Sequence, residues 1–201
     1  MHTAAVQKGQ NVKLPGAGLQ YQAVIAWADR DGSHEVDLSA LLLTSSGRVR
    51  SDADMIFYNQ PSSPEGAVRY LGNTVAEDHS EARVACDLEG LAADVHAVAL
   101  AGSVDAGTFG DLTDLHLVLR DSAGENVLRF DMADVSIETA LLFGELYRRD
   151  QSWRFRAIGQ GWDNGLAGLA TDFGISVADE VIDEDHPRDT GDAAAPSLSS
   201  W

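Results

Sequence analysis

The chain has 201 residues, 44% of them hydrophobic, and 32 acidic residues against 14 Lys and Arg give it a formal net charge of -18 at pH 7. This length suits one domain with a single sizeable core. The negative charge argues against a nucleic-acid backbone or an anionic membrane as partner, because both would repel the protein, and it leaves cations and basic surfaces open.

The single cysteine, Cys86, lies in the alternating run RVACDL, a pattern typical of a small buried side chain. One cysteine cannot form a disulfide within the chain. The N-terminal residues lack the basic and apolar regions of a signal peptide, and no window approaches the roughly 18 apolar residues of a membrane span. We therefore expect a soluble, cytoplasmic protein without an integral membrane segment.

Short runs of apolar, β-branched or aromatic residues recur between turn signals in the first two thirds of the chain. The intervening segments, such as DRDGS and SAGEN, combine Gly or Pro with Asx or Ser, which tolerate turn dihedrals. This rhythm predicts an all-β fold, a β-sandwich of two sheets with one or two short helices. The predicted strands cover residues 21–28, 35–43, 54–59, 82–88, 95–102, 115–121 and 126–132.

Residues 140–159, ALLFGELYRRDQSWRFRAIG, fit either a helix that follows a Ser136 cap or a β-hairpin. Alternation of Trp153 and Phe155 with arginines favours the hairpin, which we expect to turn at Asp150-Gln151.

A short helix is predicted over residues 165–174, with Gly174 as its C-terminal stop. We expect it to pack on the end of the sandwich. Its apolar stripe comprises Leu166, Leu169, Ala170 and Phe173.

The last segment, residues 177–201, contains seven acidic residues and one basic residue. With Pro187, Pro196 and few large apolar residues, it is expected to be a disordered tail. The folded domain would then comprise residues 1–176.

Acidic residues gather around the predicted loops. Asp52 and Asp54 precede the apolar run 55–58, and Asn59 follows it. If this segment is extended, both carboxylates lie on one face with Cα atoms about 7 Å apart, where their repulsion requires water, an arginine or a cation. Three further groups of acids are Asp29 with Asp31, Glu35 with Asp37, and Glu77, Asp78 with Glu81.

Loops at one end of a sandwich can bring such oxygens together, and Ca²⁺ takes six to eight of them. Spacing alone leaves open whether these loops bind calcium or are solvated turns. An EF-hand is excluded because Gly32 is the fourth residue of a loop that begins at Asp29, where an EF-hand loop has Gly as the sixth. The six histidines show no zinc spacing.

Four motifs in order carry a family resemblance: KGQNVKL, VRSDADMIFYNQ, ETALLFGELYRR and WRFRAIGQGWDNGLAGLATDFGI. Over about residues 6–176 the chain resembles the tellurium-resistance TerD-like family of bacterial stress proteins. The resemblance implies a β-sandwich that binds calcium through acidic loops, genes encoded beside other stress genes, and no assigned catalytic residues.

The resemblance also implies where the calcium ligands lie. The family's motifs fall on residues 51–59, 35–39 and 77–82, with Glu35, Ser80 and Ala82 replacing Asp or acidic residues. Because ligand charge sets calcium affinity, we expect one site, or weaker sites, in place of two. The expected ligand set is Asp37, Asp52, Asp54, Asp78, Glu35, Asn59, Glu81 and Asp31.

The leading hypothesis is a non-enzymatic calcium-binding stress protein whose acidic loops become ordered around the ion, with stress-operon proteins as partners. The alternative is a scaffold with degenerate acidic loops that acts through protein contacts without metal. An enzyme ranks third, because the chain has no Gly-x-Ser-x-Gly elbow, phosphate loop or paired Cys and His. Four hairpin arginines could dock an acidic loop or an anionic ligand, or could neutralise neighbouring acids: Arg148, Arg149, Arg154 and Arg156.

Overall fold

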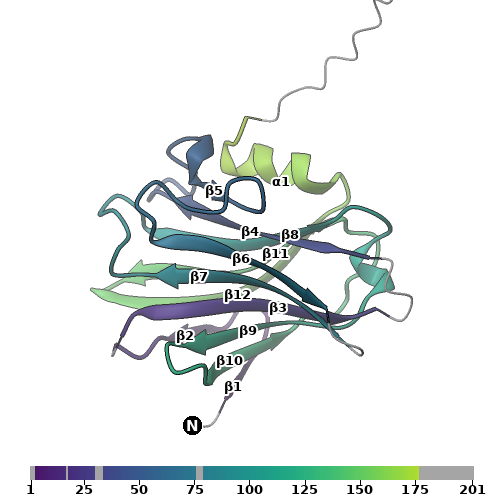
Figure 1. The fold of residues 1–201 in the computed structure, drawn as a ribbon, viewed down its shortest axis with the longest axis horizontal. Coiled ribbons are helices and arrows are strands. Elements are labelled where there is room, and N and C mark those ends of the chain that lie inside the picture. Colours follow the sequence, from purple (N-terminus) through teal and green to yellow (C-terminus); the bar gives the residue numbers. More distant parts are fainter. Residues whose placement is uncertain (1–2, 17, 30–33, 76–78, 177–201) are drawn as a thin grey trace, which may run out of the picture.

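Two six-stranded β-sheets and one α-helix make up the computed structural model (Figure 1), which describes residues 3–16, 18–29, 34–75 and 79–176. Sheet A has the order β1 (Ala4–Val6), β10 (Asn126–Asp131), β9 (Thr113–Asp121), β3 (Gln20–Ala28), β7 (Ser80–Asp87) and β6 (Val68–Val75). Sheet B has the order β2 (Asn11–Lys13), β12 (Ser152–Trp162), β11 (Ala140–Arg149), β8 (Ala97–Val104), β4 (Val36–Leu43) and β5 (Met55–Ile56). The remaining elements are the 3₁₀ helices η1 (Asp52–Asp54) and η2 (Phe109–Asp111) and the helix α1 (Gly165–Phe173).

This architecture confirms the predicted all-β sandwich. Six of the predicted strands correspond to β3, β4, β7, β8, β9 and β10. The prediction for residues 54–59 was wrong over most of its length, because only Met55 and Ile56 are in a strand and η1 occupies the preceding turn. The predicted tail, 177–201, lies outside the described residues.

The predicted hairpin is confirmed by β11 and β12, which pair antiparallel from Ala140 with Trp162 to Arg149 with Ser152. Its two turn residues, Asp150 and Gln151, have φ values of 49° and 59°. Positive φ at both central positions defines a type I′ turn, whose twist matches that of the flanking strands.

The main core lies between the sheets and is filled by the inward-facing residues of alternating strands, such as Ile25 of β3, Leu38 of β4 and Phe155 of β12. A second, smaller core lies on the outer face of sheet B. There Leu169 of α1 is buried in a cluster with Leu142 and the small side chains of β8. Helix α1 therefore covers the outer face of sheet B, and the expectation that it packs on the end of the sandwich was wrong: the alanines of β8 leave room for it on the face.

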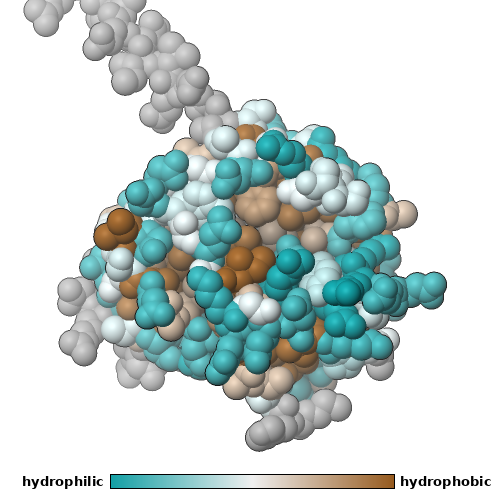
Figure 2. Space-filling view, turned by 180° about the vertical axis from the view of Figure 1, so that it is seen from behind, coloured by the Kyte–Doolittle hydropathy of each residue, from teal (hydrophilic) through white to brown (hydrophobic). Residues whose placement is uncertain are grey.

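Seen from behind, the molecule is covered largely by hydrophilic side chains, with smaller hydrophobic patches between them (Figure 2). Among the described residues, the exposed large hydrophobic side chains are Tyr58, Leu71, Val75, Ile137 and Leu166. The described part of the chain contains no helix with the length and apolar character needed to cross a membrane.

Candidate cation site

The segment around η1 holds its two acids in different environments. Asp54 is only 1% exposed, whereas Asp52 is on the surface. A 3₁₀ helix has about three residues per turn, so two residues that are two positions apart do not share a face as they would in a strand. The Asp52 carboxylate accepts a hydrogen bond from the backbone N–H of Ser176 at 3.0 Å. The expected pair of adjacent carboxylates is therefore not formed.

Arg50 supplies the positive charge next to Asp54. Its Nη2 lies 2.7 Å from Asp54 Oδ1, its Nε lies 2.8 Å from Oδ2, and its backbone N–H donates to Oδ2 at 2.9 Å. The same guanidinium pairs with Glu65 at 2.7 Å and with Asp94 at 3.1 Å. These carboxylates, Asp54 foremost, raise the pKa of Arg50.

A second acidic group lies where β4 begins and β8 ends. Val36 pairs with Val104 and Asp37 with Ser103, so Glu35, directly before β4, and Asp105, directly after β8, lie at the same rim. Partial burial raises the pKa of Asp37, and the negative charges of Asp105 and Glu35 raise it further. No Lys or Arg in the described ranges forms an ion pair with Glu35, Asp37 or Asp105. We call these three carboxylates and Asn73 the β4 rim.

Asn73 of β6 joins this rim from sheet A. Its Nδ2 donates to Glu35 Oε1 and to the backbone oxygen of Val36, both at 3.2 Å. Its Oδ1 accepts a hydrogen bond from the Tyr70 hydroxyl at 2.9 Å. Burial raises the pKa of Tyr70, and the negative charges of Asp37 and Glu35 raise it further, so the phenol lies near these carboxylates.

The other expected ligands are spread over the molecule. Glu81 is paired with Arg120 on sheet A, at 3.0 Å. Asn59 is exposed beyond β5. β5 pairs with Ala40 and Leu41 of β4, so η1 meets β4 about five residues, or about 16 Å, from Asp37. Of the described candidates, the structure brings together Glu35 and Asp37 only. Asp31 and Asp78 lie outside the described residues.

Sequence reasoning missed two residues of the β4 rim, Asn73 and Asp105. Asp105 follows a predicted strand by a few residues, and the register of β4 against β8 is what brings it opposite Glu35. Asn73 could not be placed because β6 was not predicted. Gly72, with φ 88°, interrupts the strand pattern of this segment, and the pairing of β6 with β7 shifts register between Tyr70 and Gly72.

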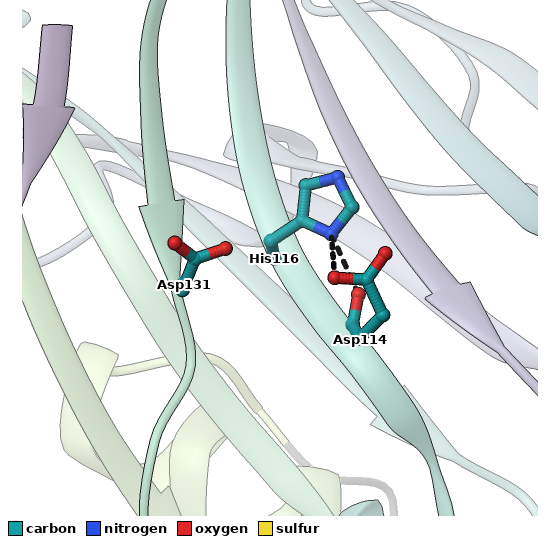
Figure 3. A group of neighbouring side chains, drawn as sticks. All are labelled: Asp114, His116 and Asp131. Atoms are coloured by element: carbon teal, nitrogen blue, oxygen red, sulfur yellow. Dashed lines mark hydrogen bonds and ion pairs between the residues drawn. The ribbon is translucent and has the colours of Figure 1, made fainter.

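A third group of potential metal ligands was also missed. Ligand atoms of Asp114, His116 and Asp131 all lie within 4.8 Å of one another, from β9 and β10 (Figure 3). The His116 ring nitrogen Nδ1 lies 2.6 Å from the backbone oxygen of Asp114. The sequence signal for this group is the Asp-Leu-His spacing, which puts two ligands on one face of a strand.

Arg129 already supplies a positive charge to that group. Its Nη2 lies 2.7 Å from Asp114 Oδ1, its Nε 2.7 Å from Asp131 Oδ1, and its Nη1 2.9 Å from His116 Nε2. A metal ion bound there would have to displace this guanidinium. The β4 rim, whose carboxylates have no such partner among the described residues, is therefore the better candidate cation site.

The fold and the rim together define an acidic β-sandwich in which carboxylates of sheet B and an asparagine of sheet A lie near the ends of strands. The TerD domain model matches residues 2–173, and the chain belongs to the TerD family, a family of tellurite-resistance and stress-response proteins.

Similar proteins carry names of the same kind. The chain is 35% identical to the tellurium resistance protein TerD of Serratia marcescens over 191 residues, covering 88% of this chain and all of the relative. It is 34% identical to general stress protein 16U of Bacillus subtilis (strain 168), covering 87% of this chain and 99% of the relative. The fold is similar to the crystal structure of a homologue of telluride resistance protein (TerD) from Streptomyces coelicolor A3(2), with a TM-score of 0.63 and 19% identity over 78% of this chain and 98% of that one.

Proposed function

We propose that the protein is a non-enzymatic, calcium-binding member of the tellurite and stress response, and that the β4 rim provides the ion site. The observation that carries this proposal is Asp37: a half-buried carboxylate with two acidic neighbours and no basic ion-pair partner among the described residues. Such a group costs free energy in the folded state unless a cation neutralises it. Calcium would remove that cost.

The chemistry of the donors favours calcium. Glu35, Asp37 and Asp105 offer carboxylate oxygens, which hard cations prefer, and Asn73 positions Glu35 through a hydrogen bond from its amide nitrogen. Asp31 and Asp78 follow β3 and β6 in the chain and are the proposed additional ligands. Ca²⁺ accepts a larger and more flexible set of oxygens than Mg²⁺, so ligands on separate elements suit it better.

The proposed site is smaller than the set expected from the sequence. Both carboxylate oxygens of Asp54 accept hydrogen bonds from Arg50. Asp52 lies next to Asp54 in η1, which meets β4 far from Asp37. We therefore propose one calcium site at the β4 rim. The names of the relatives, tellurium resistance protein and general stress protein, support a role in resistance rather than in catalysis.

The test is thermal unfolding of the chelator-treated full chain with Ca²⁺ or Mg²⁺. A ligand at 100 times its Kd stabilises the native state by about 2.7 kcal/mol, so we expect a clear rise in Tm with calcium and little with magnesium. Asp37→Asn should abolish the rise, whereas the matched variant Asp163→Asn, at an exposed position before α1, should keep it. An unchanged Tm in millimolar calcium would contradict the proposal.

A second candidate function is a scaffold that works through protein contacts without metal. Two of the expected ligands favour it, because Asp54 and Glu81 are paired with Arg50 and Arg120. In that case the affinity for a stress-operon partner would be the same with calcium and with chelator, and Asp37→Asn would leave it unchanged.

A further inference from the structure

An unbalanced pair of positive charges lies on the outer face of sheet B. Lys13 of β2 and Arg154 of β12 are directly opposite each other in the antiparallel register. Because Trp153 and Phe155 point into the main core, Arg154 faces outward, and Lys13 lies on the same side. Like charges directly opposite each other on neighbouring strands destabilise a sheet.

Neighbouring arginines show how this surface normally balances its charge. Arg156 pairs with Glu145 at 2.7 Å, and its guanidinium carbon lies 4.9 Å from the centre of the Tyr147 ring. Arg149 lies 3.5 Å from Asp150.

Lys13 and Arg154 have no such partner: within the described ranges, neither forms an ion pair or a side-chain hydrogen bond. Arg154 Nε is in addition hidden from solvent without an acceptor. A buried donor of this kind costs free energy until an acceptor reaches it. The positive charges of Lys13 and Arg154 are therefore not balanced by any of the described residues.

The chain itself provides a segment of the opposite charge. Residues 177–201 carry seven acids and one base, and five of the acids fall within residues 179–185. This segment follows α1, which packs on the same outer face of sheet B. Its starting point is fixed by Ser176, whose N–H donates to Asp52 next to β5.

The distance from that starting point can be bridged. β5 and β2 are the two edges of sheet B, five strand spacings or about 24 Å apart. Residue 185 is nine residues beyond Ser176, which corresponds to about 30 Å of extended chain. Of the five acids, Asp183, Glu184 and Asp185, which lie seven to nine residues beyond Ser176, can therefore reach Arg154 across the face of the sheet.

We propose that Lys13 and Arg154 form a docking surface for the acidic segment 177–201 of the same chain. Arginine binds carboxylates through two parallel hydrogen bonds, and the neighbouring lysine adds a second positive charge. This surface lies on sheet B at β2 and β12, away from the β4 rim, so the proposal does not depend on calcium.

The test uses a carbodiimide, which joins an amine to a carboxylate in contact with loss of water, on the full chain. Lys8 and Lys13 are the only lysines, so the cross-linked peptides can be assigned by mass spectrometry. We expect cross-links in the monomer between Lys13 and the acids at 183–185, with Lys8, which bonds the backbone oxygen of Gly159, as the internal control. Arg154→Gln should cause loss of these cross-links, whereas Arg69→Gln, a change at an exposed arginine of sheet A, should not.

Three results would overturn the proposal. The first is a folded monomer in which Lys13 gives no more cross-links to the acids at 183–185 than Lys8 does. The second is cross-linking only between two copies, which would assign the surface to self-association. The third is suppression of the cross-links by inorganic phosphate but not by sodium chloride at equal ionic strength, which would assign it to a free oxyanion.

Discussion

Arg50 and Asp54 form a bidentate ion pair across four residues, with N–O distances of 2.7 and 2.8 Å and an almost completely buried carboxylate. The pair holds η1 to the chain that precedes it, and the contacts of Arg50 to Glu65 and Asp94 add two loops to the same guanidinium.

Removing the arginine should be costly. In Arg50→Gln the buried Asp54 carboxylate loses its cation, and breaking a buried ion pair in this way costs about 3–5 kcal/mol. Urea unfolding should show a lower midpoint by that amount. Arg50→Gln with Asp54→Asn should recover part of the loss; equal stability of the wild type and Arg50→Gln would show that the pair is unimportant.

Removing the charge of Asp37 should have the opposite effect on stability to removing Arg50. Without metal, Asp37→Asn removes repulsion from Glu35 and Asp105, so the free energy of unfolding should rise, by about 0.2–1 kcal/mol for a like-charge neighbour in a sheet. Chelator-treated protein in urea provides the measurement. A lower stability of the variant would mean that the charge is balanced by an unseen partner.

Calcium stabilisation should depend on pH in a defined direction. The pKa of Asp37 is raised above its ordinary value of 3.8 in the folded state. Without metal, its contribution to stability is therefore fully present below about pH 3.8 and is lost as the pH rises through the raised pKa. Calcium needs the ionised form, so its Tm increment should fade on acidification at a higher pH than for an ordinary aspartate. Tm with and without calcium between pH 4 and 7 tests this; an increment that is flat over that range would exclude Asp37 as a ligand.

Cys86 should be chemically inert in the native protein. It is completely buried, and burial raises the pKa of its thiol to about 12. Because the thiolate is the reactive form, a thiol reagent at pH 8 should modify it only at the rate of unfolding. Rapid labelling in native buffer, compared with labelling in denaturant, would disprove this.

The hairpin turn offers a stabilising substitution. Gln151 has a φ of 59°, a conformation that costs a residue with a side chain about 1 kcal/mol and that glycine adopts freely. Gln151→Gly should therefore raise the free energy of unfolding by about 0.5–1 kcal/mol. Gly47→Ala, where φ is 77°, is the converse control and should lower it.

Local signals in the sequence were enough for most of the fold. Alternation identified the buried strands such as β3 and β9, and the change from alternation to turn residues at Asp150 located the hairpin. The failures occurred where a side-chain ion pair or pairing with a neighbouring strand overrides the alternation pattern. Residues 52–54 form a turn because Arg50 holds Asp54 from four residues away, and β6 pairs despite Gly72 because its neighbour β7 extends alongside it.

The candidate site was less predictable for the same reason. Spacing identified Glu35 and Asp37, which are close in the chain, but which other acids join them depends on strand register. Asp105 is brought to the rim by β8, and Asn73 by β6. Conversely, Asp54 and Glu81 match the pattern expected for ligands, yet Asp54 pairs with Arg50, four residues before it, and Glu81 pairs with Arg120 from another strand.

The edge strands of the two sheets affect how the protein can associate with other molecules. Three of the four edge strands, β1, β2 and β5, contain only two or three residues. The fourth, β6, is partly covered by the segment that bridges Ser62 to Arg69, and its ladder is irregular at Gly72. A long edge strand with unpaired backbone N–H and C=O groups is a template to which the strand of another chain can pair. With such short and interrupted edges, the described part of the sandwich offers little template for open-ended polymerisation through its backbone, which favours contacts with other proteins through side-chain surfaces.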